Sequence, residues 1–97
     1  MGIMNKILLI EDDQSINKIL AYELSKKGYQ VDSLFDGKEA VQTILKNDYD
    51  LVLVDWMLPY QNGVSIIKEV RSNDYVKPLI LLTARSEQED IIKGLEA

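Results

Sequence analysis

The chain has 97 residues, a formal net charge of −5, 46% hydrophobic residues, and neither cysteine nor histidine. This length fits one small domain, and the missing residue types exclude disulfides, thiolate or imidazole metal ligands and histidine-dependent catalytic triads. The negative charge argues against direct binding of nucleic acid, and the absence of a long apolar run or a visible signal peptide argues against a membrane segment.

Short apolar runs predict the strands of a parallel sheet. Three of them consist only of leucine, isoleucine and valine, without polar alternation, which is typical of strands buried on both faces. A fourth run, which begins near Tyr29, alternates apolar and polar residues, and this favours a strand at the edge of the sheet. We therefore expect strands over 6–10, 30–35, 51–55 and 78–83.

Helical patterns lie between and after these strands. Apolar residues recur at spacings of three and four, and Ser86 with Glu89 forms a capping box before the last of these patterns. Gly28 fits the position that ends a helix. The strict alternation predicts an α/β domain with a parallel sheet covered by helices on both faces. The expected helices span 14–27, 37–47, 62–72 and 86–96.

Polar residues follow each of the three buried strands. The first strand runs into Glu11, Asp12 and Asp13, the third into Asp55 and the fourth into Thr83. The carboxyl ends of neighbouring parallel strands meet at one edge of the sheet, which is where open α/β sheets bind ligands. Carboxylates that gather there repel one another unless a cation joins them, and oxygen donors favour Mg²⁺.

Each of these residues also has a simpler interpretation. Asp13 fits the N-cap of a helix, Glu11 and Asp12 fit a solvated turn, Asp55 fits a turn cap, and Thr83 fits a strand end. Together, the simpler interpretations do not explain why acids follow two buried strands and a hydroxyl follows the third. A metal-bound carboxylate beside a hydroxyl suits phosphoryl transfer, in which the carboxylate is the nucleophile and forms an acyl phosphate.

Three stretches, in this order, resemble the receiver domain of bacterial two-component response regulators. They are Leu8-Leu9-Ile10-Glu11-Asp12-Asp13, then Leu53-Val54-Asp55-Trp56-Met57-Leu58-Pro59 with Gly63, and Leu81-Leu82-Thr83-Ala84-Arg85. The resemblance covers residues 6–97. It implies a flavodoxin-like, doubly wound sheet with strand order 2-1-3-4, without the family's fifth strand and helix. The wording of the motifs is most similar to the subfamily with a winged-helix DNA-binding output domain.

The resemblance also implies a site. Asp55 would be the phosphoacceptor, Asp12 and Asp55 would ligate Mg²⁺ directly, Glu11 would act through water, and Met57 would supply its backbone carbonyl. Thr83 would be the switch hydroxyl, with Ala84 as the small neighbour that keeps the site accessible. A histidine kinase would be the phosphodonor and an output domain the partner. The chain would be a cytoplasmic signalling protein and not a turnover enzyme.

One part of the family pattern has no match in this chain. The family's fifth strand ends in a lysine that contacts the phosphoryl group, and Lys77-Pro78 does not match it because this pair precedes the fourth strand. We therefore expect slow phosphorylation of these 97 residues. We also expect self-association, either along the exposed edge of the fourth strand or by a swapped terminal segment.

Three alternatives remain at this stage. A phosphatase of the haloacid dehalogenase type would place a D-x-D pattern after the first strand, where this chain has Glu11-Asp12-Asp13. A flavodoxin-like cofactor binder would need a phosphate loop there, and three acids would repel a phosphate. A degenerate receiver would only mediate protein contacts.

Overall fold

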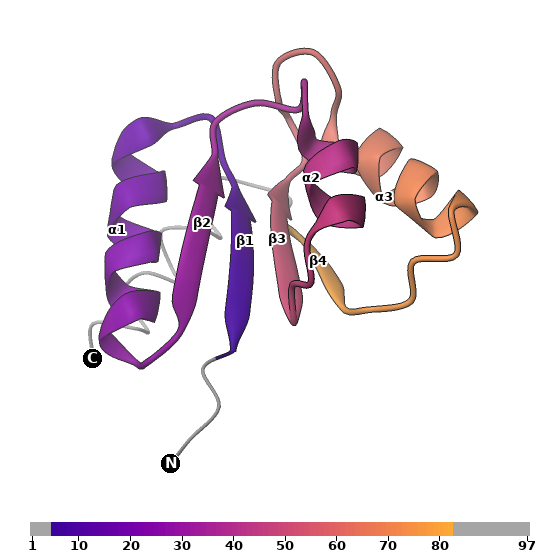
Figure 1. Cartoon of the computed structure of the whole chain (residues 1–97). Helices are drawn as coiled ribbons and strands as arrows, with labels where there is room; N and C mark the ends of the chain where they lie inside the picture. The colour runs from indigo at the N-terminus through magenta and orange to yellow at the C-terminus, as the bar shows by residue number, and fades with distance from the viewer. Residues whose placement is uncertain (1–4, 83–97) are drawn as a thin grey trace.

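The computed structural model of the chain describes residues 5–82 (Figure 1). In this range strands and helices alternate along the chain. Thr83, Ala84 and the predicted helix over 86–96 lie outside the described residues. The elements are β1 (Lys6–Ile10), α1 (Gln14–Lys26), β2 (Gln30–Leu34), α2 (Ala40–Lys46), β3 (Leu51–Asp55), α3 (Gly63–Ser72) and β4 (Leu79–Leu82).

The four strands form one parallel sheet in the order β2-β1-β3-β4. The prediction of a flavodoxin-like sheet with order 2-1-3-4 is confirmed, as is the position of β2 at an edge. The register aligns the carboxyl ends of the strands, since Ile10 is paired with both Leu34 and Val54, and Asp55 is paired with Leu82. Side chains that follow β1 and β3 are therefore brought to the same edge of the sheet.

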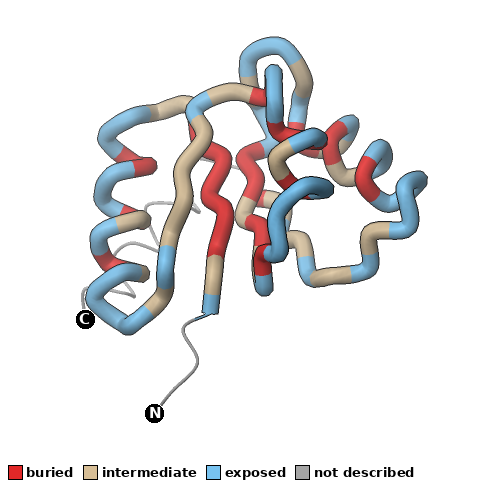
Figure 2. The backbone as a smooth tube through the Cα atoms, in the orientation of Figure 1, coloured by how far each residue is buried: buried red, intermediate tan, exposed pale blue. Residues whose placement is uncertain are grey.

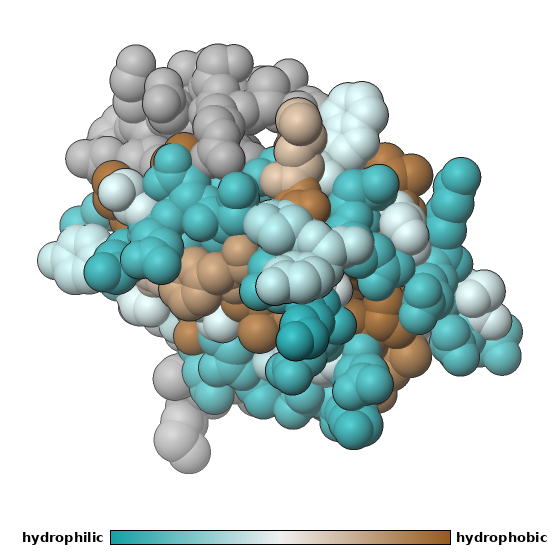
Figure 3. Space-filling view, turned by 90° about the horizontal axis from the view of Figure 1, so that it is seen from above, coloured by the Kyte–Doolittle hydropathy of each residue, from teal (hydrophilic) through white to brown (hydrophobic). Residues whose placement is uncertain are grey.

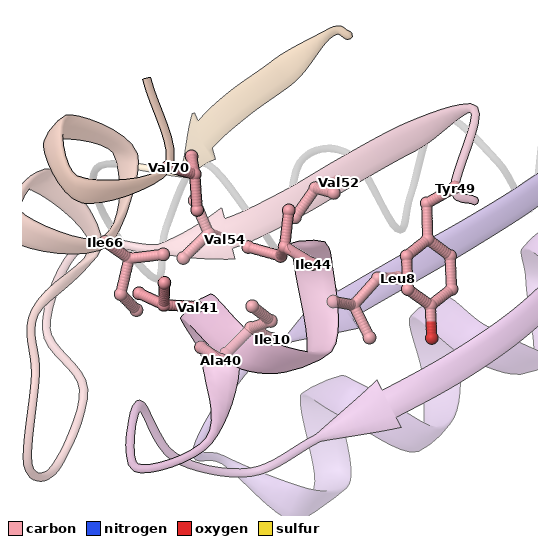
Figure 4. Packing of buried hydrophobic residues seen from close by; sticks show 10 residues of the cluster. All are labelled: Leu8, Ile10, Ala40, Val41, Ile44, Tyr49, Val52, Val54, Ile66 and Val70. Atoms are coloured by element: carbon pink, nitrogen blue, oxygen red, sulfur yellow. The ribbon is translucent and has the colours of Figure 1, made fainter. Parts of the chain in front are cut away.

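Helices cover both faces of the sheet, as predicted (Figure 1), and much of β1 and β3 is buried between them (Figure 2). Each face has its own core. On one face α1 packs through Ile16 and Leu20 against Leu9 of β1. The other face packs against α2 and α3, and Figure 4 shows how its side chains interdigitate. This second core consists of Leu8, Ile10, Ala40, Val41, Ile44, Tyr49, Val52, Val54, Ile66 and Val70.

The start of α2 differs from the prediction. The helix begins at Ala40 and not at residue 37, because two other hydrogen bonds hold the preceding residues. The N–H of Lys38 donates to Oδ1 of Asp36 over 2.9 Å, which makes an Asx turn, and the N–H of Gly37 donates to the carbonyl oxygen of Pro59 over 2.9 Å. Local turn chemistry and a tertiary contact therefore override the helical pattern here.

Paired polar groups lie between the middle of the sheet and its amino-terminal edge. The hydroxyl of Tyr49, which is buried, donates to Oδ2 of Asp32 over 2.8 Å, and Lys6 Nζ lies 3.9 Å from the same oxygen. Burial, together with the hydrogen bond to Asp32, raises the pKa of Tyr49 to about 12. Lys77 forms an ion pair with Asp48 at this edge. Lys77 therefore precedes β4, at the amino end of the sheet, as the sequence predicted.

The outer strands of the described sheet are β2 and β4. Ile80 of β4 is 47% exposed. Self-association along β4 stays a prediction, because the structure contains a single chain. Among the described helices, none has the length and apolar character that a membrane span requires.

Candidate functional site

Three carboxylates meet at the carboxyl-terminal edge of the sheet. One carboxylate oxygen from each of Glu11, Asp12 and Asp55 lies within 4.8 Å of the other two. Glu11 and Asp12 follow β1 directly, and Asp55 is the last residue of the neighbouring strand β3. Glu11 is fully buried, Asp55 is 4% exposed, and Asp12 is half-buried. The pairing of β1 with β3 therefore brings together acids that are 43 or more positions apart in the sequence.

The turn from β1 to α1 is stabilised by its own acids. The N–H of Asp13 donates to Oε1 of Glu11 over 2.9 Å, and Oδ1 of Asp13 accepts the N–H of Ile16 over 3.1 Å. Asp13 is thus the N-cap of α1, which confirms the simpler interpretation of this residue. The carboxylate of its neighbour Asp12 lies close to those of Glu11 and Asp55.

Asn17, a residue that the sequence did not single out, connects this turn to the end of β2. Its side chain is 1% exposed, and its Nδ2 donates to the carbonyl oxygens of Glu11 over 3.1 Å and Leu34 over 3.2 Å. The N–H of Glu11 also donates to Leu34, over 3.0 Å. One signal was present in the sequence, because Asn17 shares the apolar stripe of α1 with Leu20 and Leu24, and a polar residue there needs a buried partner.

On the other side of the site, the start of α3 packs closely against the backbone at the end of β3. A Cβ added to Gly63 would lie 2.5 Å from the carbonyl oxygen of Asp55 and 2.7 Å from Cδ1 of Leu81. The N–H of Gly63 donates to the carbonyl oxygen of Trp56 over 2.8 Å. A glycine is required here because of space: the start of α3 packs directly on the end of β3.

A hollow of about 610 Å³ opens beside Asp12. Asn62, Leu58 and Pro59 line it together with Trp56 and Met57, whose side chains are 46% and 78% exposed. Figure 3 views this edge of the sheet from above and shows hydrophobic surface set among hydrophilic side chains. The hollow gives a ligand a route from solvent to Asp12.

The loop between β3 and α3 is also fixed by the loop between β2 and α2. A Cβ on Gly37 would lie 2.1 Å from the carbonyl oxygen of Gln61, so only glycine fits this contact. Lys38 Nζ lies 5.6 Å from the centre of the Tyr60 ring. Tyr60 has a φ of 73°, a conformation that residues with a side chain adopt rarely. The wall of the hollow is therefore held by contacts from two loops.

The structure brings together Glu11, Asp12 and Asp55, and it places Met57 at the hollow beside them. Thr83 and Ala84, the remaining predicted site residues, lie outside the described residues. The gathered groups are hard oxygen donors, which match the preference of Mg²⁺ for carboxylates with water and phosphate oxygens in the remaining positions. The donor set therefore fits a divalent cation of this kind.

Comparisons with known proteins agree with this geometry. The family model of the response regulator receiver domain matches residues 7–97. The chain is 41% identical over 93 residues to response regulator ArlR of Staphylococcus saprophyticus, and 43% identical over 91 residues to transcriptional regulatory protein DltR of Streptococcus agalactiae. These matches cover 96% and 94% of this chain, but 42% and 41% of the two relatives, so the chain spans less than half of their length.

A solved structure shows the same fold. The receiver domain of the Francisella response regulator 1452 matches with a TM-score of 0.80 at 36% identity, over 95% of this chain and 76% of that one. The architecture and strand order thus agree with what the sequence motifs implied.

Proposed function

Because this chain belongs to the receiver domains of two-component response regulators, we propose that Asp55 accepts a phosphoryl group in a Mg²⁺-dependent reaction. The observation that carries this proposal is the cluster of Glu11, Asp12 and Asp55 within 4.8 Å. Asp55 ends β3 beside two further acids, and the hollow next to them is open to solvent. The sequence left open a phosphatase of the haloacid dehalogenase type, and such phosphatases are a different family from the receiver domains.

Each group in the cluster has a distinct role in the proposal. A carboxylate oxygen of Asp55 attacks phosphorus, a phosphorus–oxygen bond forms, and the bond from phosphorus to the donor atom breaks with its electron pair going to the donor. Asp12 and Asp55 would hold Mg²⁺ directly, Glu11 would act through water, and the backbone carbonyl of Met57 would complete the protein ligands. The ion would supply positive charge that balances the phosphoryl oxygens.

We assign the roles outside the described residues in the same way. Thr83 is the hydroxyl that responds to the phosphoryl group, and Ala84 keeps the site open. The product is an acyl phosphate on the protein itself, so the chain acts as a phosphoacceptor and not as a turnover enzyme. A histidine kinase is the proposed donor, in the cytoplasm.

The relatives suggest what the phosphorylated domain controls. One of them is named a transcriptional regulatory protein, and both are more than twice as long as the matched region. We propose that a DNA-binding output domain, outside this chain, is regulated by the state of Asp55. The receiver itself would not bind DNA directly, in keeping with its net charge of −5.

The test is phosphorylation by acetyl phosphate with Mg²⁺, read by intact mass. The protein that carries this chain is expected to gain one phosphoryl group, and the Asp55→Asn variant none. Asp50→Asn is the matched control, since Asp50 lies at the opposite edge of the sheet and its carboxylate accepts the N–H of Lys6. Equal labelling of the Asp55→Asn variant, or no labelling of the parent protein, would refute the proposal.

A further inference from the structure

We propose that Asn17 is a positioning residue for the magnesium site, acting through hydrogen bonds to the backbone around it. This inference rests on the proposed function of the acidic cluster. It starts from an asparagine side chain that is 1% exposed inside α1 and donates two hydrogen bonds to backbone carbonyls outside that helix.

The first of these bonds fixes the backbone before Asp12. The carbonyl of Glu11 belongs to the peptide unit that joins Glu11 to Asp12, and Nδ2 of Asn17 donates to it over 3.1 Å. The peptide unit after Asp12 is fixed as well, because the N–H of Asp13 donates to Oε1 of Glu11. With both peptide planes held, only the two side-chain torsions of Asp12 remain to place its carboxylate.

The second bond fixes where this turn sits relative to the sheet. Nδ2 of Asn17 donates to the carbonyl oxygen of Leu34, the last residue of β2, and that oxygen also accepts the N–H of Glu11. The N–H of Asn17 donates in turn to the carbonyl oxygen of Asp13 over 2.9 Å, within the first turn of α1. One side chain therefore joins α1, the turn that carries Asp12, and the end of a strand.

The physical consequence concerns affinity for the cation. Three carboxylates must be held close together for Mg²⁺ to bind, and without the ion their mutual repulsion favours motion apart. A buried amide that holds the turn opposes this motion. Groups that orient metal ligands without touching the ion typically change metal affinity by roughly 10–100-fold when they are removed.

The experiment is a calorimetric Mg²⁺ titration of the full chain, with the fluorescence of Trp56 as a second readout. The Asn17→Leu variant keeps a side chain of similar size but donates no hydrogen bond. We expect its Mg²⁺ dissociation constant to rise roughly 10–100-fold, and amide hydrogen exchange at Asp12 and Asp13 to become faster in the metal-free state. Asn17→Ser keeps one donor, so a smaller increase is expected, and this variant decides the question if Asn17→Leu does not fold.

The matched control is Tyr49→Phe, which removes a side-chain hydrogen bond at the other edge of the sheet. It is expected to lower stability and leave Mg²⁺ affinity unchanged. A folded Asn17 variant with the parent's dissociation constant and parent-like exchange at Asp12 would overturn the inference and leave the proposed function intact. If the parent chain itself shows neither heat nor a fluorescence change with Mg²⁺, the proposed function fails, and the inference fails with it.

Discussion

The two edges of the sheet use acidic residues in opposite ways. At the amino-terminal edge, Asp32 accepts a hydrogen bond from Tyr49 and lies 3.9 Å from Lys6, and Asp48 forms an ion pair with Lys77. At the carboxyl-terminal edge, three carboxylates lie within 4.8 Å of one another. A cation or hydrogen-bond donor beside a carboxylate favours its charged form, whereas carboxylates brought close to one another repel. The acids near the amino-terminal edge therefore serve stability, and those at the carboxyl-terminal edge serve the proposed chemistry.

The largest expected effect comes from filling the space at the carboxyl-terminal edge. Gly63→Ala would place a Cβ 2.5 Å from the carbonyl oxygen of Asp55, so either α3 or β3 must move. We expect a loss of about 1–3 kcal/mol in the free energy of unfolding, as for other overpacked sites, together with weaker Mg²⁺ binding. Urea unfolding and a Mg²⁺ titration measure the two effects.

Gly28→Ala is the counterpart at the other edge. Gly28 has a φ of 98°, and among the described residues, its chain neighbours aside, no atom lies within 4 Å of an added Cβ. This substitution is expected to cost about 1–2 kcal/mol through backbone strain alone and to leave Mg²⁺ affinity unchanged. Weaker Mg²⁺ binding by Gly28→Ala would contradict the separation of the two edges.

The next effect concerns a hydrogen bond at the amino-terminal edge. Tyr49→Phe removes the donor to Asp32 while keeping the buried ring. We expect the free energy of unfolding to fall by about 1 kcal/mol, the net value of a typical hydrogen bond. Thermal unfolding without Mg²⁺ checks the loss, and an unchanged melting temperature would show that the bond contributes no net stability.

Two substitutions that each remove one negative charge are expected to change the free energy of unfolding in opposite directions. In the absence of Mg²⁺, Asp12→Asn relieves repulsion within the acidic cluster and should raise the free energy of unfolding by about 1 kcal/mol. Asp32→Asn weakens the contact with Lys6, which is a partly exposed pair, and should lower it by less than about 1 kcal/mol. Chemical denaturation of both variants under the same conditions tests the comparison. A loss of stability in both would contradict the assignment of repulsion to one edge only.

The smallest expected effect is a pH dependence at the amino-terminal edge. The hydrogen bond and charge of Lys77 lower the pKa of Asp48 from its ordinary value of 3.8. A carboxyl group with a lowered pKa in the folded state contributes stability above its ordinary pKa, and this contribution is lost as the pH falls through the folded value. The stability of the parent chain should therefore decrease slightly more than that of Asp48→Asn on acidification below about pH 4. Parallel melting curves across this range would detect the difference.

The sequence alone determined the elements of the fold and the residue types at the site. Continuous apolar runs at 7–10 and 51–54 indicated buried parallel strands, because only strands covered on both faces avoid polar alternation. The acids that follow them, Glu11, Asp12 and Asp55, indicated a cation site because parallel strands end at a common edge. The position of β2 at an edge also followed from its alternating pattern.

Tertiary structure decided what depends on contacts between distant residues. The delayed start of α2 depends on a bond from Gly37 to Pro59, and the need for glycine at position 63 depends on the carbonyl of Asp55. The partners of Asn17 are carbonyls in a turn and in a strand, and nothing in the spacing of a helix indicates which distant carbonyls its polar side chain meets. Periodicity reports which face of an element is buried, whereas backbone approach and side-chain hydrogen bonds exist only once the elements have packed.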